Sequence, residues 1–231
     1  MKRGLNTIAA VFMSASLLVG CEATKNANNK QKGAVIGATS GAVLGGVIGN
    51  NTKGGNTALG AIIGGVVGGA AGGYIGSRMD KQAKQIEQEI PGAEVERVGE
   101  GINVTFDESS GVYFDSEKYS VNAKSQETLK KLIGIFKEYP DTNVLVEGHT
   151  DDTGSESYNL TLSKNRAQAV TSYLVNNGLS RGRFDTKWYG ESQPKYDNTT
   201  EDGRAKNRRV ELAIVANEKM KQEAEQATSE E

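Results

Sequence analysis

The sequence has few of the residues that form disulfides or bind zinc. It contains one cysteine and one histidine among 231 residues, so an intramolecular disulfide is not possible. Acidic and basic residues nearly balance, and the formal net charge of −2 argues against nucleic acid as the main partner. The hydrophobic content is low at 36%, whereas glycine is abundant with 29 residues. The length is enough for one folded domain with appendages.

The amino terminus, residues 1–20, has the features of a secretion signal. Two basic residues precede an apolar stretch from Ile8 to Leu18 that is too short to span a membrane comfortably. The sequence Leu18-Val19-Gly20-Cys21 resembles a bacterial lipobox, which implies that Cys21 becomes the lipidated first residue of the mature chain. More than one acyl chain, such as palmitate, would anchor it firmly in a membrane. The alternative is an ordinary signal peptide followed by a chance cysteine.

Two glycine ladders at residues 33–76 follow a polar tether at residues 21–32. In two runs without charged residues, every fourth position is glycine, at 33, 37, 41, 45 and 49 and again at 60, 64, 68, 72 and 76. Residues four apart share a helix face, so each run predicts a helix with a bare glycine groove. The polar residues 50–57 between the runs indicate a turn. The pattern predicts a helical hairpin, similar to the glycine-zipper segment of some outer-membrane lipoproteins.

Helix propensity opposes these predicted helices. Each helical glycine costs about 1 kcal/mol relative to alanine, so the isolated hairpin should not be stable in water. Close backbone approach between small residues, as in membrane helices, could compensate. Three interpretations stay open: a hairpin inserted in or lying on the membrane, a self-associating periplasmic stalk, and a flexible linker.

The rest of the chain alternates predicted strands and helices. A charged helical linker at 77–92, with little apolar face beyond Met79 and Ile86, ends at Pro91-Gly92, the expected domain boundary. Residues 93–217 predict a hairpin at Glu94–Phe106, strands at Gly111–Asp115, Asn143–Glu147, Phe184–Tyr189 and Val210–Ile214, and helices at Asn122–Tyr139, Ser157–Asn177 and Gly203–Asn207. This order predicts an α/β (α+β) sandwich with helices on one face. The charged tail at 218–231 is expected to fray.

One stretch, residues 148–167, places charged side chains around the end of a predicted strand. It begins after the apolar run Val144–Val146, passes through a polar turn containing Gly154, and becomes helical. Asp151 is therefore expected just after a strand and Arg166 about one turn inside the next helix. An anion and a cation at one sheet edge suit a ligand that carries both an ammonium and a carboxylate.

This stretch resembles the signature of the OmpA-like peptidoglycan-binding domain. The sequences GHTDDTGSESYNLTLSKNRAQAV and NTTEDGRAKNRRVE occur in the family's order and at its spacing, and the resemblance covers roughly residues 93–217. It implies a β-α-β-α-β-α-β fold, with Asp151 and Arg166 gripping the diaminopimelate of the peptide stem. It places four more residues around them: Phe114, Asp115, Asn159 and Leu162.

The chemistry of these residues agrees with that ligand. Asp151 can accept hydrogen bonds from an ammonium, and Arg166 offers a planar fork for a carboxylate. Asn159 can donate and accept, and Leu162 supplies an apolar wall for methylene groups. The alternative for Asp151 and Arg166 is a structural ion pair, and Asp115 is a candidate for orienting backbone groups instead of touching ligand. Structural roles are expected for three others: pairing with acidic neighbours for Arg208 and Arg209, and turn-stabilising hydrogen bonds for His149.

The predicted function is non-catalytic: a lipoprotein that tethers the outer membrane to the cell wall, with no cofactor or metal. With one histidine and a lipidated cysteine, the chain lacks the residues that the usual catalytic triads and catalytic zinc sites need. Asp151 and Asp152 are adjacent in the chain, so they are poorly placed to flank the glycosidic bond of a substrate. A stator-like or channel protein would need a spanning helix with an ionisable residue, which the apolar runs lack. A membrane-inserting or pore-like oligomer of the glycine hairpin stays open as an added role. Since Glu22 and not aspartate follows Cys21, the resemblance implies an outer-membrane address with the domain facing the periplasm.

Overall fold

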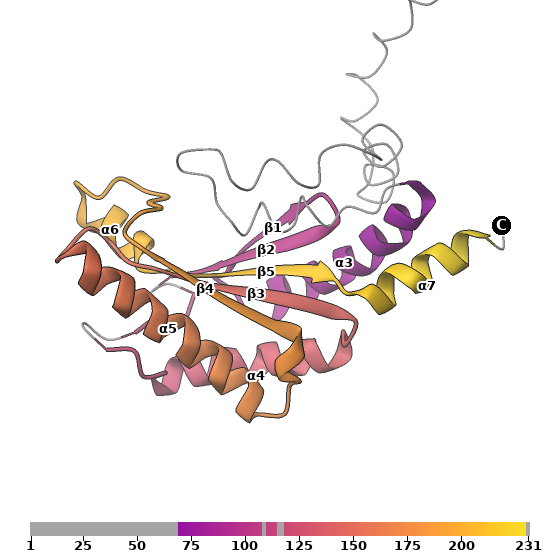
Figure 1. Ribbon diagram of the computed structural model, residues 1–231, viewed down its shortest axis with the longest axis horizontal. Coiled ribbons are helices and arrows are strands. Elements are labelled where there is room, and N and C mark those ends of the chain that lie inside the picture. The colour runs from indigo at the N-terminus through magenta and orange to yellow at the C-terminus, as the bar shows by residue number, and fades with distance from the viewer. Residues whose placement is uncertain (1–68, 108–109, 115–117, 230–231) are drawn as a thin grey trace, which may run out of the picture.

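The computed structural model describes residues 69–107, 110–114 and 118–229 (Figure 1). The signal, Cys21 and most of the glycine ladders lie outside these residues and stay predictions. Five strands form one sheet in the order β1-β2-β5-β3-β4. The strands are β1 (Glu94–Val98), β2 (Gly101–Phe106), β3 (Thr142–His149), β4 (Phe184–Gly190) and β5 (Val210–Ala216). The helices are α3 (Gly69–Glu89), α4 (Ala123–Glu138), α5 (Glu156–Asn176), α6 (Glu201–Asn207) and α7 (Glu218–Ser229), with a short 3-10 turn at Arg181–Arg183.

The predicted topology is confirmed. From β2 onward the chain runs β2-α4-β3-α5-β4-α6-β5, which is the β-α-β-α-β-α-β order. Strands β3 and β4 pair in parallel through the α5 crossover, whereas β1–β2, β2–β5 and β5–β3 are antiparallel. Helices α4 and α5 lie on the same face of the sheet (Figure 1). Because β3 and β5 are antiparallel, the carboxyl end of β3 lies beside the start of β5.

The core lies between this face and the helices. Val144 and Val146 on β3 stand opposite Ile214 and Leu212 on β5, and all four side chains are buried. The predicted apolar faces of α4 and α5 pack onto them, and their buried residues are Leu129, Leu132, Ile133, Phe136, Ala167, Val170 and Leu174. Both helices begin at a side-chain cap, since Asn122 accepts from the N–H of Ser125 and Ser155 from that of Tyr158.

One predicted strand is absent. Residues 110–114 form turn and irregular structure, and Asp115 lies outside the described residues. The backbone of Tyr113 is instead bonded to side chains at the start of α4: Ser125 Oγ accepts its N–H at 3.0 Å and donates to its carbonyl at 2.8 Å. Asn122 Nδ2 donates to the same carbonyl at 3.1 Å. These side chains satisfy the polar groups that a sheet would otherwise have to pair.

Helix α3 contributes to the core, so the expectation of little apolar face at residues 77–90 is wrong. A stripe with four- and three-residue spacing is buried among the strands and α4, and it consists of Ala71, Ile75, Met79, Ala83, Ile86 and Ile90. The stripe begins inside the second glycine ladder, so only part of it is visible from residue 77 onward. Arg97 on β1 fixes the helix further, because its Nε pairs with Asp80 at 2.9 Å. The predicted domain boundaries themselves stay a prediction.

The expected fraying of the tail is also wrong, because the tail forms helix α7. Met220 and Ala224, four residues apart, are buried, and α7 packs against α3 (Figure 1). Arg78 on α3 pairs with Glu223 on α7 at 2.8 Å. Packing against α3 thus buries the two apolar residues of α7, which the sequence of the tail does not reveal alone.

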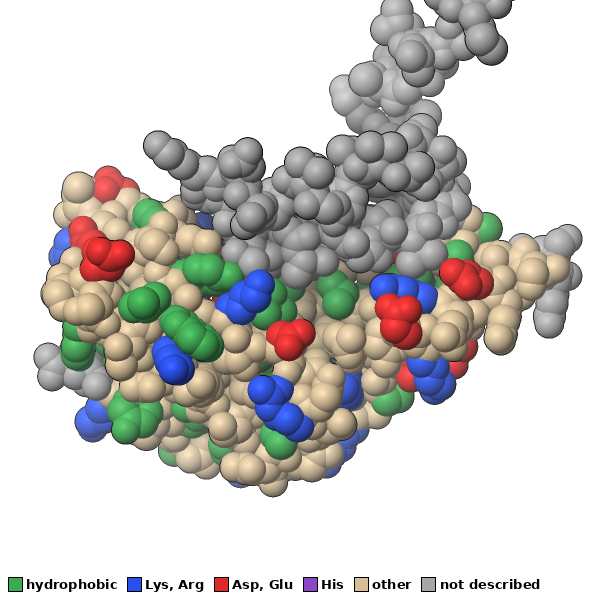
Figure 2. Space-filling model, viewed as in Figure 1, with side chains coloured by type: hydrophobic (Ala, Val, Ile, Leu, Met, Phe, Trp, Pro, Cys, Tyr) green, Lys and Arg blue, Asp and Glu red, His purple; other side chains and the backbone are tan. Residues whose placement is uncertain are grey.

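On the face shown in Figure 2, acidic and basic side chains are interspersed without a continuous basic area. Among the described residues, no helix combines the length and hydropathy that crossing a membrane requires.

The packing of α3 predicts that Met79→Ala destabilises the whole domain. The side chain is fully buried, so we expect the free energy of unfolding to fall by about 2–5 kcal/mol. Urea denaturation of a fragment spanning residues 69–229 measures this. Lys84→Ala is the matched control, since Lys84 is an exposed residue of the same helix. Equal stability of the two variants would contradict a core role for α3.

Candidate functional site

A groove of about 430 Å³ lies at the carboxyl end of β3, between α5 and α6. Five of the six residues predicted to bind ligand line it, namely Phe114, Asp151, Asn159, Leu162 and Arg166. Asp115, the sixth, lies outside the described residues. The groove is also lined by Thr150, Thr153, Gly154, Tyr158, Glu201, Arg204 and Arg208. The structure therefore brings the predicted residues together at the expected sheet edge, and adds charged residues from α6.

Asp151 is fixed at the start of the loop after β3. The residue is only 7% exposed. Its Oδ1 accepts the N–H of Thr153 at 3.0 Å, which closes a local turn of the kind that aspartate favours. Its Oδ2 accepts from Nη1 of Arg208 at 2.7 Å. An ionised carboxylate has about four acceptor sites, so Asp151 can keep both bonds and still accept from a ligand ammonium.

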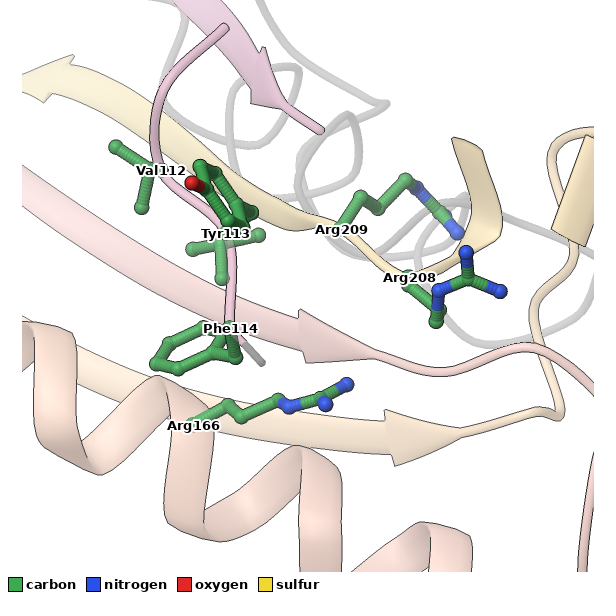
Figure 3. A pocket seen from close by; sticks show the side chains of 7 residues that line it. Val112, Tyr113, Phe114, Arg166, Arg208 and Arg209 are labelled. Carbon is green, nitrogen blue, oxygen red and sulfur yellow. The ribbon is translucent and has the colours of Figure 1, made fainter. Parts of the chain in front are cut away.

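Arg166 reaches the groove from inside α5. It is 4% exposed, its Nε donates to the carbonyl of Lys118 at 3.1 Å, and its guanidinium lies 5.2 Å from the centre of the Phe114 ring. Tyr158 and Leu162 line the same groove, because residues four apart share a helix face. In Figure 3, Phe114 lies along the Arg166 side chain, and the guanidinium groups of Arg166 and Arg208 extend in the same direction.

Gly148 sets the distance between α5 and the sheet. A Cβ on this residue would stand 2.3 Å from the carbonyl oxygen of Ser163 and 3.1 Å from the Cβ of Ala167. Only glycine allows this approach. Because Arg166 is adjacent to Ala167, the close packing at Gly148 also determines how far the arginine reaches past the end of β3.

Asn159 holds the loop against α5. It is buried, and its Nδ2 donates to the carbonyls of Asp151 at 3.3 Å and Thr153 at 3.2 Å, and to Oε2 of Glu191 at 2.5 Å. Gly154 completes the turn with φ of +107°, a conformation that residues with a side chain rarely adopt. Asn159 therefore fixes the Asp151 loop in addition to lining the groove.

The two adjacent arginines have acidic partners, as predicted, but in different places. Arg209 is buried, and its Nε pairs with Oε1 of Glu211 at 2.6 Å. Arg208 bridges Asp151 at 2.7 Å and Glu201 at 3.7 Å. The two side chains leave adjacent positions just before β5 (Figure 3), yet they pair with different acids. The acidic partner of Arg208 is thus the predicted ligand residue itself, so Arg208 belongs to the groove.

Sequence reasoning missed Arg204, Glu201, Arg208 and Tyr158 as groove residues. For Tyr158 a signal was available, because it precedes Leu162 and Arg166 by four and eight residues. For the α6 residues none was, since their place depends on how β5 inserts between β2 and β3. Among the described residues, no group of three potential metal ligands is assembled.

His149 does not make the turn-stabilising hydrogen bonds that we expect from the sequence. Its ring is 1% exposed, neither ring nitrogen has a hydrogen-bond partner among the described residues, and it stacks on Tyr189 with ring centres 5.5 Å apart. Only its backbone N–H bonds locally, to the carbonyl of Arg209 at 3.0 Å. Burial, helped by the positive charge of Arg209, lowers the pKa of His149 from 6.5 to about 3. The residue is therefore a neutral packing group.

This burial predicts a pH dependence of stability. The unfolded chain binds a proton at His149 below its ordinary pKa of 6.5, whereas the folded chain binds it only near pH 3. The free energy of unfolding should therefore fall as the pH drops from 6.5 towards 3, by about 1.4 kcal/mol per pH unit from this residue. We expect His149→Phe, which keeps the stacking on Tyr189, to remove that part of the slope.

Urea denaturation of both proteins between pH 4 and pH 8 measures the difference in slope. The two curves should be parallel above pH 7, which serves as the internal control. An imidazole that titrates near its ordinary pKa in the folded protein, seen by NMR, would contradict the assignment.

Comparisons with known proteins relate two segments of the chain to known families. Residues 113–208 match the family model described as the OmpA family, and residues 1–80 match the YMGG-like Gly-zipper model. The chain is 45% identical over 123 residues to outer membrane porin F of Pseudomonas aeruginosa, covering 53% of this chain and 34% of the porin. It is 34% identical over 139 residues to the probable lipoprotein YiaD of Escherichia coli K12, covering 60% of this chain and 64% of YiaD.

Two further relatives are named for the cell wall. The peptidoglycan-binding protein ArfA of Mycobacterium bovis is 38% identical over 103 residues, which are 45% of this chain and 32% of ArfA. The solved structure of the cell wall anchor of the T6SS from Pseudomonas aeruginosa superposes with a TM-score of 0.51 and 29% identity, covering 61% of this chain and 98% of that one. The chain thus spans about one third to two thirds of the length of these three curated relatives.

Proposed function

Because residues 113–208 form an OmpA-family domain, we propose that this domain binds peptidoglycan by holding the diaminopimelate of the peptide stem, and that it does no chemistry on it. The observation that carries the proposal is the juxtaposition of Asp151 with Arg166 and Arg208 in one groove. The free end of diaminopimelate carries an ammonium and a carboxylate on one carbon, so it needs an anion and a cation side by side. Relatives named for peptidoglycan binding and for cell wall anchoring support peptidoglycan as the polymer that is bound.

The proposed binding mode follows from how each group is held. The ligand ammonium donates to Asp151, whose bonds to Thr153 and Arg208 keep the carboxylate in place. The ligand carboxylate lies against the guanidinium of Arg166, whose orientation is set by the carbonyl of Lys118. Phe114 and Leu162 form the apolar wall for the methylene chain. Because these groups are held before the ligand arrives, little conformational entropy is lost on binding.

The acids of the groove are poorly suited to catalysis. Glu201 accepts a hydrogen bond from Arg204 at 2.5 Å, and this bond lowers the pKa of Glu201. A general acid needs a pKa near the working pH, so the lowered pKa of Glu201 disfavours that role. Asp151 is held by its ion pair with Arg208. The groove therefore suits recognition of charge in the ligand.

We further propose that the chain is anchored by acyl chains on Cys21 in the outer membrane, with the domain in the periplasm. Relatives named as an outer membrane porin and a probable lipoprotein support this address. The layout of the domain suits a tether. Helix α3, through which the chain enters, has its start at the opposite end of the sheet from α6 and the groove (Figure 1).

The ligand assignment predicts a loss of binding in Asp151→Asn and Arg166→Lys. The asparagine can still close the turn to Thr153, but it leaves the ligand ammonium without a counter-charge. The lysine keeps the positive charge but cannot give two parallel hydrogen bonds. Each change should cost roughly 2–5 kcal/mol, which is thirty-fold or more in affinity. Calorimetry with soluble diaminopimelate stem peptides measures it, on the fragment of residues 69–229 that includes α3 and α7.

Matched controls come from the neighbouring residues. Asp152→Asn makes the same change at the neighbouring acidic residue, and Lys164→Gln removes a positive charge from α5. Neither position lines the groove, so both variants should bind like the wild type. Circular dichroism checks that each variant is folded. The assignment fails if the groove variants bind as well as these controls. Equal affinity for stems that carry lysine in place of diaminopimelate would overturn the role of Arg166, since lysine lacks the distal carboxylate.

The anchor proposal predicts that Cys21→Ser abolishes lipidation. The variant lacks the thiol that accepts the lipid, so the protein should appear as an uncleaved or soluble periplasmic form. Metabolic labelling with a palmitate analogue, followed by membrane fractionation, measures this. A variant that is still labelled and sediments with the outer membrane would rule Cys21 out as the lipidated residue.

A further inference from the structure

We propose that Arg204 forms a second carboxylate site in the groove, which binds a carboxylate of the peptide stem outside the diamino acid. The inference rests on the proposed function, because it names a further part of the same ligand. It makes Arg204 a residue that determines which chemical forms of the stem are bound tightly.

A line of alternating charges runs along the α6 side of the groove. Arg204 Nη2 lies 2.5 Å from Glu201 Oε2, Glu201 Oε1 lies 3.7 Å from Arg208 Nη2, and Arg208 Nη1 lies 2.7 Å from Asp151 Oδ2. The opposite side is the face of α5. A ligand held at Asp151 therefore has a second arginine farther along the same wall.

The groove offers more guanidinium groups than the proposed diaminopimelate grip uses. Three arginines belong to its described lining, Arg166, Arg204 and Arg208. In the proposed binding mode Arg166 takes the carboxylate of the diaminopimelate end and Arg208 holds Asp151, so Arg204 is the arginine with no role in that grip. A volume of about 430 Å³ is within the range that holds a ligand larger than one amino acid.

Arg204 is held in place and still reaches the groove. Its Nη1 donates to the carbonyl of Asn198 at 2.9 Å, and its Nη2 to Glu201. A guanidinium has five N–H donors, so these two bonds leave others for a ligand. The Arg204 side chain is 28% exposed, whereas that of Glu201 is 73% exposed. Water screens the exposed Glu201, which leaves the positive charge of Arg204 only partly neutralised.

The stem offers two carboxylates of this kind. One is the α-carboxylate of the glutamate that is linked through its side chain, and the other is the terminal carboxylate of the last residue. Both have the same chemistry, and converting either to an amide removes its charge with little change in shape. The experiment therefore uses three soluble stem peptides: one with both carboxylates, one with the glutamate amidated, and one with the terminus amidated.

Calorimetry of the full-length protein in detergent measures the affinity for each peptide. For wild type we expect one of the two amides to weaken binding about fivefold, the strength of a partly exposed ion pair. Arg204→Gln should lose the same factor with the unmodified peptide, and should no longer distinguish the amidated one. Lys206→Gln is the matched control, since Lys206 is also paired with an acid of α6 but lies outside the groove lining.

A second variant protects the test against misfolding of α6. Glu201→Gln keeps Arg204 and removes its neutralising partner, so we expect it to bind the unmodified peptide tighter than wild type. Arg204→Gln that binds all three peptides like wild type, or that keeps the preference between them, would overturn the second site. If wild type discriminates by amide while Asp151→Asn binds unchanged, the proposed diamino acid grip fails instead. Absence of binding by wild type overturns both.

Discussion

The ion pair between Asp151 and Arg208 joins the two central strands where the groove is built. Gly148 on β3 stands opposite Val210 on β5, so the residues just after β3 and just before β5 meet at one edge. The pair closes this edge at 2.7 Å and connects positions 57 residues apart. Every charged group of the groove is placed relative to it: Arg166 through the packing of α5, and Glu201 and Arg204 through α6.

This pair also explains why a charged groove is compatible with a stable domain. A partly buried carboxylate without a partner would destabilise the fold, and Arg208 supplies that partner when no ligand is bound. In the proposed binding mode, the ligand ammonium adds to an existing arrangement and does not have to create one. Asn159 and Gly148 serve the same end from the other side, since one holds the loop and the other lets α5 approach the sheet.

The helices and the residues nearest the motif could be predicted from sequence because their signals are local. The apolar faces of α4 and α5 follow the helical period, and Asp151 and Arg166 follow a strand and turn within a short stretch. The segment at 111–114 has the composition of a strand, but its backbone is bonded to Ser125 and Asn122 instead. The stripe of α3 begins inside the glycine ladder, and that of α7 has only two residues, so neither is complete within the segment that sequence reasoning treated as one element. Arg208 and Arg204 could not be assigned to the groove, because the strand order that brings them there is non-local.

The burial of α3 has a mechanical consequence. Any pull exerted on the chain ahead of residue 69 acts first on a helix whose apolar stripe is interlocked with β2 and α4, and whose Asp80 is clamped by Arg97. A force between the start of α3 and the groove would act roughly along the strands of the sheet. The hydrogen bonds between strands would therefore be loaded in shear, all at once, and not broken one after another. We therefore expect α3 to separate from the sheet before the strands separate from one another. The groove residues would be displaced last.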